Sequence, residues 1–287
     1  MTFARSLPSS TTWEGTTWRG EPAWTSVHGT VRAVVTTARE RLIHLGSVDG
    51  IVNLLNAPYP HVLPSEQQPW PNQGGHRFWL GPQKSWVWPP PTDWEYAAAA
   101  AVRVDGGVLI VEQPHTDSSY PAITREYAWE GTRLRCTARW RDEGRPYFGM
   151  HVIPVDLPFM GSARLSKTTE IPLGLVDVRL EGAAADNFLP HPAITIDHEQ
   201  ATLSGGRKII KVGFFPQPLT VARVNQWTLS VLPGPNEGVA LNSPDLGYLS
   251  QIWVGAPEHD LAELEQLTPY LRGNAQGVCA STIYLAA

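Results

Sequence analysis

Short segments of alternating apolar and polar residues, each ended by a glycine-rich turn, run through most of this chain. Turn signals such as VDGG, WEGT, RDEG and SGGR separate the segments, and helical periodicity over ten or more residues is scarce. Alternation with a period of two is typical of half-buried strands. The only helix expected is a short one within the alanine-rich stretch 95–104. The predicted strands cover residues 31–37, 41–48, 107–113, 133–140, 147–155, 208–215, 226–232, 248–255, 261–267 and 279–286.

This spacing predicts an all-β fold, a large antiparallel sandwich of two sheets. The 26 prolines and 25 glycines exceed their average share, which suits many short strands and turns. No internal repeat or linker-like change of composition divides the chain. We therefore expect a single β-sandwich domain over residues 1–287, with residues 1–24 as a candidate loosely ordered N-terminal segment.

Charge and motifs exclude several classes of partner. The net charge is −5, from 22 basic and 27 acidic residues without a basic run, so nucleic acid is not an expected partner. No signal peptide or membrane-spanning window is present, which predicts a cytoplasmic protein, monomeric or homodimeric, that does not enter a membrane. Cys136 and Cys279 are then expected as reduced core thiols. Neither CxxC nor HExxH occurs, so we expect no metal and no cofactor.

Tryptophan gathers in the stretch NQGGHRFWLGPQKSWVWPPPTDW, residues 72–94, which holds four of the twelve tryptophans. Three consecutive prolines, 89–91, exclude a helix across them, and no clear strand is visible between residues 53 and 94. So long a segment without regular structure is usually a functional loop or disordered, and its aromatic content argues against disorder. We expect an ordered loop whose indoles stack on sugar rings; the alternative is that they close one end of the core.

Three motifs follow one another along the chain: GGHRFWLGPQ…WPPP (74–91), RDEGRPYFGMHVIPV (141–155) and AELEQLTP (262–269). In this order they resemble the galactose mutarotase-like superfamily of β-supersandwich proteins, which includes the aldose 1-epimerases, and the resemblance spans roughly residues 25–285. It is greatest to an uncharacterised bacterial branch with a GGHR-W…WPP segment. It implies the supersandwich fold and a sugar-like small-molecule substrate.

The resemblance also implies catalytic roles. His151 would be the general acid toward the ring oxygen, Glu265 would take the proton from the anomeric hydroxyl, and His76 and Arg77 would bind hydroxyls. Independently, Gly149 shares the strand face of His151 and leaves room for a ligand, although a hydrogen-bonded core histidine fits equally.

The choice between the late-strand carboxylates stays open. Glu263 and Glu265 share a face flanked by leucines, where carboxylates are costly unless functional; alternatively, that face meets solvent. The remaining substrate-binding candidates are aromatic: Trp79, Trp86, Trp88, Trp227 and Trp253.

The resulting hypothesis is an acid/base enzyme of the isomerase class, epimerase- or mutarotase-like, acting on a sugar or another small cyclic hydroxylated compound. Three alternatives remain open. The protein could bind carbohydrate without chemistry, it could be a lyase, cyclase or isomerase of a secondary metabolite on the same fold, or its tryptophan cluster could dock a partner.

Overall fold

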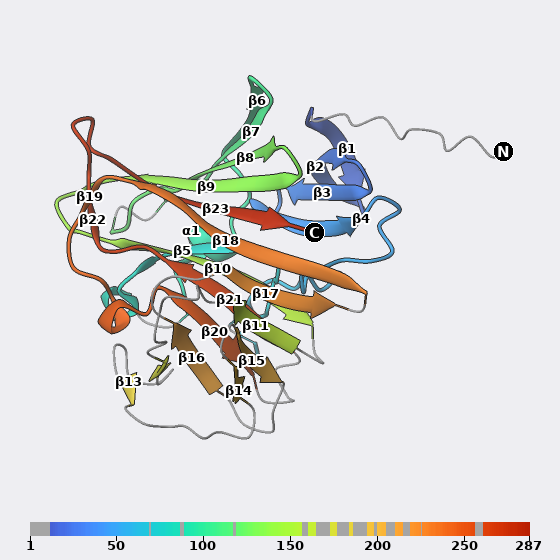
Figure 1. Ribbon diagram of the computed structural model, residues 1–287. Coiled ribbons are helices and arrows are strands. Elements are labelled where there is room, and N and C mark those ends of the chain that lie inside the picture. The colour runs from blue at the N-terminus through green and yellow to red at the C-terminus, as the bar shows by residue number, and fades with distance from the viewer. Residues whose placement is uncertain are drawn as a thin grey trace.

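The computed structural model is built almost entirely of strands, which confirms the predicted all-β fold (Figure 1). Among the residues that it describes, the strands form four antiparallel sheets, of ten, seven, four and two strands. The described residues are 12–68, 70–86, 89–116, 119–156, 160–164, 173–176, 184–185, 194–197, 200–204, 210–214, 219–224, 226–255 and 261–287.

The two large sheets carry most of the chain. In spatial order, the seven-stranded sheet consists of β13 (Ala184–Ala185), β12 (Leu173–Val176), β16 (Ile210–Phe214), β20 (Ser250–Val254), β21 (Leu261–Leu267), β10 (Phe148–Asp156) and β5 (Arg77–Gly81). The ten-stranded sheet consists of β14 (Ile194–Ile196), β15 (Gln200–Ser204), β11 (Met160–Arg164), β17 (Leu219–Val224), β18 (Trp227–Glu237), β23 (Val278–Ala286), β9 (Arg133–Arg141), β8 (Thr124–Glu130), β7 (Val108–Glu112) and β6 (Ala101–Asp105).

Smaller elements complete the described part. The four-stranded sheet is formed by β1 (Glu14–Trp18), β2 (Glu21–His28), β3 (Val31–Thr36) and β4 (Arg41–Ser47), and the two-stranded sheet by β19 (Val239–Ala240) and β22 (Leu271–Arg272). The short helices are η1 (Gln83–Ser85), α1 (Thr92–Glu95) and η2 (Asp245–Gly247). β1 and the start of β2 thus lie within residues 1–24, and the alanine-rich stretch 95–104 is mostly loop and the strand β6.

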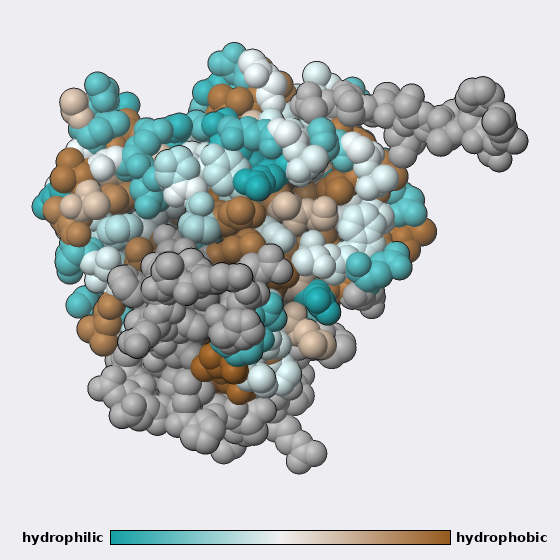
Figure 2. Space-filling model, viewed as in Figure 1, coloured by the Kyte–Doolittle hydropathy of each residue, from teal (hydrophilic) through white to brown (hydrophobic). Residues whose placement is uncertain are grey.

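The main hydrophobic core lies between the two large sheets. Ile153 and Leu264 of the seven-stranded sheet pack in one buried cluster with Val231 and Ile283 of the ten-stranded sheet. Side chains alternate along each strand, so one face of each sheet supplies this core while the opposite face is free to carry charged groups. On the surface seen in Figure 2, hydrophilic and hydrophobic residues are interspersed.

The tryptophan-rich stretch is not a loop throughout, which corrects the sequence analysis. Its residues Arg77–Gly81 form β5, which pairs with β10 at the end of the seven-stranded sheet. All five residues are buried, so the segment lacks the alternation that betrays a half-buried strand. Gly81 is required for close packing, because a Cβ there would come 2.0 Å from the Phe148 ring.

Both cysteines are buried and free, as expected. No helix in the described part of the chain is long and apolar enough to cross a membrane.

Candidate functional site

The seven-stranded sheet has two chemically different faces. We call the face that packs on the ten-stranded sheet the inner face, and the opposite one the outer face. In the pairing of β10 with β21, Val152 lies opposite Glu265, whereas His151 lies opposite Gln266. Directly opposed residues share a face and neighbours along a strand alternate, so His151 and Glu265 project from opposite faces. The roles implied for His151 and Glu265 require both side chains to reach the same sugar ring. The strand register places them on opposite faces of the sheet, so this expectation is wrong.

The inner face holds a chain of neutral hydrogen bonds. His151 Nδ1 lies 2.9 Å from His76 Nε2, and His151 Nε2 lies 3.0 Å from Ser281 Oγ on β23. The two imidazoles stack with their planes 11° apart. Burial lowers the pKa of His151 to about 3, and burial together with His151 lowers the pKa of His76. Both rings are neutral at ordinary pH, so the alternative of a hydrogen-bonded core histidine describes His151 in this structure.

The space expected beside Gly149 is filled. A Cβ at this glycine would come 2.7 Å from the Phe78 ring and 3.3 Å from the Ser281 side chain. His151 itself is 0% exposed. Gly149 therefore serves close packing between the sheets and leaves no room for a ligand on this face.

Arg77 occupies the centre of a polar cluster on the outer face. Its Nη1 donates to Glu263 Oε1 at 2.7 Å, and its Nη2 donates to Asn72 Oδ1. Its guanidinium carbon lies 5.1 Å from the ring centroid of Trp70 and 5.7 Å from that of Trp79. The guanidinium is fully buried and is fixed by a carboxylate, an amide and two indoles.

A second ion pair lies on the same face and joins β16 to β21, the strand that also carries Glu263. Lys211 Nζ donates to Glu265 Oε2 at 2.7 Å. Trp253 lies opposite Glu263 on one side and opposite Lys211 on the other. One row of the outer face thus reads carboxylate, indole, ammonium across three strands, with the Glu265–Lys211 pair beside it.

The charged side chains of the row and of the pair beside it differ in their exposure to solvent. The side chains of Glu263 and Lys211 are each 15% exposed, whereas that of Glu265 is 4% exposed. Burial raises the pKa of Glu263, and the Arg77 guanidinium offsets part of that rise. Although burial opposes it, the Glu265 carboxylate raises the pKa of Lys211. Glu263 and Lys211 are therefore the groups of opposite charge that a ligand could reach.

Four residues of the outer face were not predicted: Asn72, Lys211, Asp245 and Gln251. Gln251 lies opposite Glu265 and donates through Nε2 to Asp245 Oδ2 at 2.6 Å. Of these four, only Lys211 had a visible signal, a charged residue two positions before a glycine in an otherwise apolar strand. The others depend on loop placement and strand register, which the sequence does not show.

The remaining tryptophan candidates divide among several places. Trp79 and Trp253 lie on the outer face, whereas Trp86 is buried and donates through Nε1 to Leu80 O at 2.9 Å. Trp88 lies outside the described residues. Trp227 is at the start of β18 on the ten-stranded sheet, away from the polar cluster.

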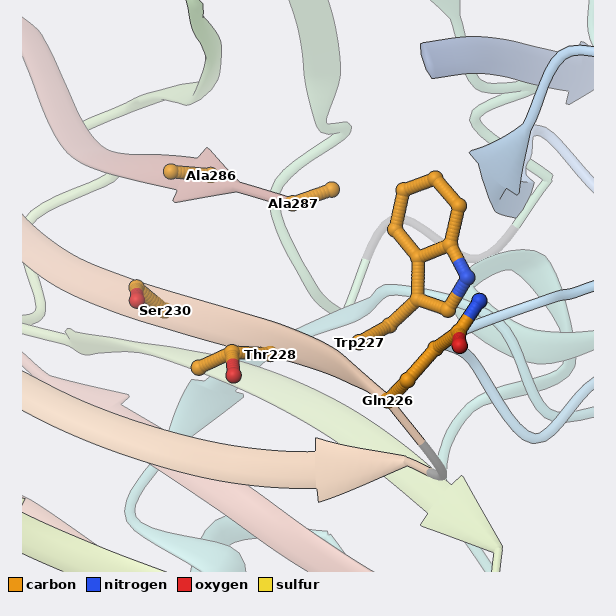
Figure 3. Close-up of a pocket in the computed structure, with 6 residues that line it drawn as sticks. All are labelled: Gln226, Trp227, Thr228, Ser230, Ala286 and Ala287. Atoms are coloured by element: carbon orange, nitrogen blue, oxygen red, sulfur yellow. The ribbon is translucent and has the colours of Figure 1, made fainter. Parts of the chain in front are cut away.

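Trp227 lines an open groove of about 640 Å³ on the ten-stranded sheet (Figure 3). Its indole stands beside the Gln226 amide at one end of the groove, and the hydroxyls of Thr228 and Ser230 follow along β18. None of the six lining residues carries a charged side chain.

In the part of the chain that the structure describes, no group of three or more His, Cys, Asp or Glu side chains is placed to hold a metal ion. The polar cluster on the outer face is instead a set of ion pairs, amides and indoles. Such a set suits hydrogen bonding to hydroxyl groups and proton transfer at a carboxylate.

Comparison of the sequence with protein-family models finds no match, and comparison with curated proteins finds none either. Solved structures, by contrast, share the fold of this chain. The chain aligns with a galactose mutarotase related enzyme from Lactobacillus acidophilus with a TM-score of 0.56 and 8% identity, over 92% of this chain and 96% of that one. A galactose mutarotase-like protein from Lactobacillus casei gives 0.53 and 7%, over 92% and 99%.

A third neighbour shows the same fold within a longer chain. It is a TPR-domain containing protein from Parabacteroides distasonis, and the alignment has a TM-score of 0.54 and 11% identity. The alignment covers 92% of this chain but only 46% of that protein. At such identities a likeness speaks for architecture and not for chemistry. This chain has the galactose mutarotase-like fold.

Proposed function

We propose that the protein binds a sugar-like hydroxylated ring on the outer face of the seven-stranded sheet and catalyses proton transfer on it, as an aldose 1-epimerase-like isomerase. The observation that carries the proposal is the row Glu263–Trp253–Lys211, in which an indole lies between a carboxylate and an ammonium group. Indole faces stack on the C–H faces of sugar rings, and the flanking groups could then meet hydroxyl and ring oxygens on either side.

The two charged groups suit opposite roles in ring opening. Glu263, the more exposed carboxylate, would take the proton of the anomeric hydroxyl as the bond between the anomeric carbon and the ring oxygen breaks. Lys211 would donate its proton to the ring oxygen, which gains that electron pair. Rotation about the adjacent carbon–carbon bond and reversal of both transfers give the other anomer and restore both groups.

The supporting residues have definable tasks. Arg77 holds Glu263, and Glu265 holds Lys211, each at 2.7 Å. Because each reactive group already has a counter-charge, the site suits an uncharged ring better than an anionic one. The raised pKa of Glu263 brings its proton affinity closer to that needed for transfer near neutral pH.

The test is interconversion of anomers, measured by exchange NMR over a panel of neutral hexoses and pentoses. Glu263→Gln and Lys211→Met should each lower the exchange rate by at least about 100-fold, which is the scale of general acid–base catalysis. Thr228→Ala, in the distant groove, is the matched control and should exchange at the parental rate. Exchange in the parent no faster than in buffer, for every sugar, would sink the proposal.

A second function is favoured by the groove beside Trp227. Its indole, amide and hydroxyl groups could hold a neutral glycan without any chemistry, as a carbohydrate-binding surface does. Calorimetric titration with oligosaccharides would show this as binding that Trp227→Ala abolishes and Glu263→Gln leaves unchanged. The same fold could also serve a lyase or cyclase, for which anomer exchange would be absent while Glu263 was still required for turnover.

A further inference from the structure

The Trp79 indole contacts Arg77 on the outer face and is also hydrogen-bonded to a buried carboxylate. Its Nε1 donates to Glu95 Oε1 at 2.6 Å, a short distance typical of a hydrogen bond to a charged acceptor. Glu95 is the last residue of α1, and its side chain is completely buried. The indole therefore has one contact toward the site and one toward the interior.

Glu95 is fixed in turn by Arg41, a fully buried residue at the start of β4. Arg41 Nη1 lies 3.3 Å from Glu95 Oε2, and Arg41 Nη2 donates to the Glu95 carbonyl oxygen at 2.6 Å. Arg41 also donates through Nε to the carbonyl of Arg39 at 3.0 Å. Arg41 thus holds Glu95 at one carboxylate oxygen and at its backbone carbonyl, so the carboxylate is fixed independently of the indole and the indole follows it.

A continuous line of contacts thus runs from the interior to the reactive carboxylate: Arg41, Glu95, Trp79, Arg77 and Glu263. We infer that Glu95 is a positioning residue for the site, acting through Trp79 on the guanidinium that holds Glu263. The catalytic importance of Glu95 rests on the proposed function. Its effect on the Glu263 carboxylate does not, because the contacts that link the two residues are present in the free protein.

The physical reason lies in the two contacts of the indole. A hydrogen bond to a carboxylate fixes the ring plane and pulls the indole proton away, which adds electron density to the face that attracts a cation. The guanidinium is then held over the ring with Nη1 directed at Glu263. Without the carboxylate, the ring gains freedom and the guanidinium stabilises the ionised form of Glu263 less.

The experiment follows the titration of Glu263 in the free protein by carbon-detected NMR of the side-chain carboxyls, assigned with Glu263→Gln. Glu95→Gln keeps the shape of the side chain and removes its charge; Trp79→Phe keeps a ring and removes the N–H donor. Both changes should shift the protonation equilibrium of Glu263 toward the protonated form by about fivefold to tenfold, which lies between the strengths of an exposed and a fully desolvated cation–π contact.

Trp129→Phe is the matched control. Its indole lies on β8 of the ten-stranded sheet and donates through Nε1 to Ser26 Oγ at 3.0 Å, so the change removes an equivalent N–H donor and the Glu263 titration should not move. An unmoved titration in a folded Glu95→Gln protein would overturn the inference, and if that variant does not fold, Trp79→Phe decides alone. In anomer exchange, Glu95→Gln should lower kcat with little change in KM. If the parent protein showed no anomer exchange, the proposed function would be wrong, but the titration result would still test the positioning role of Glu95.

Discussion

The two faces of the seven-stranded sheet solve the burial of polar groups in different ways. On the inner face, His76, His151 and Ser281 form a neutral hydrogen-bonded chain without any charge. On the outer face, Glu263 and Lys211 keep their charges through ion pairs and keep part of their surface open. Neutral groups that are hydrogen-bonded to one another inside a core are structural, whereas charges retained near solvent are available for chemistry. The difference assigns stability to one face and reactivity to the other.

Removal of the central imidazole should give the largest effect. His151→Ala creates a cavity between the sheets and leaves His76 and Ser281 without their shared partner. We expect a loss of about 3–4 kcal/mol in the free energy of unfolding, from the cavity and the unsatisfied groups together. Urea unfolding followed by fluorescence measures it. A loss below about 1 kcal/mol would break the structural assignment of the inner face.

Overpacking of the same face should cost less. Gly149→Ala places a Cβ 2.7 Å from the Phe78 ring, and we expect a loss of about 1–3 kcal/mol as the core adjusts. Gly15→Ala on β1, where a Cβ meets nothing within 4 Å, is the control and should change stability little. If Gly149→Ala were equally silent in thermal unfolding, there would be room beside His151 after all.

Acid should weaken the inner face selectively. The folded-state pKa of His151 is lowered to about 3 from its ordinary 6.5, so its contribution is complete above pH 6.5 and is lost as pH falls toward 3. We expect the unfolding free energy to fall by about 1 kcal/mol per pH unit below 6.5 from this group. Subtraction of the pH curve of His151→Asn, which cannot titrate there, isolates the slope. Identical curves would mean that the imidazole titrates with the same pKa in the folded and the unfolded state, so that burial does not lower the pKa.

Much of the fold could be predicted from the sequence, because alternation and turn signals are local. The ends of β21, Leu261–Leu267, agree with the sequence analysis at both residues, and Glu263 and Glu265 do share a face. The strand β5 was not predicted, because its residues are buried on both faces and therefore show no alternation of apolar and polar side chains. A strand that shows no contrast between its faces cannot be told from other apolar segments by pattern.

The candidate site was less predictable, because it depends on register between distant segments. The face of His151 relative to that of Glu265 follows from pairing of β10 with β21, and a slip of one residue would reverse it. The placement of Lys211 beside Glu265, and of Asp245 beside Gln251, likewise arises from pairings and loops that no local pattern encodes. The sequence indicated which types of residue would form a site, but it did not show which of them come together in the fold.

The smallest expected change in stability tests the outer face. The pKa of Glu263 is raised above 4.5, chiefly by burial, so its contribution to stability is complete below pH 4.5 and is lost as pH rises through the folded-state pKa. Glu263→Gln should therefore gain stability relative to the parent as pH rises, the reverse of the histidine slope, with a difference under about 1 kcal/mol because the carboxylate is partly exposed and ion-paired. Unfolding curves at pH 4.5 and pH 8 measure this difference. If the variant instead lost several kcal/mol at pH 8, the Arg77–Glu263 pair would be holding the fold together, and the two faces would no longer divide stability from reactivity.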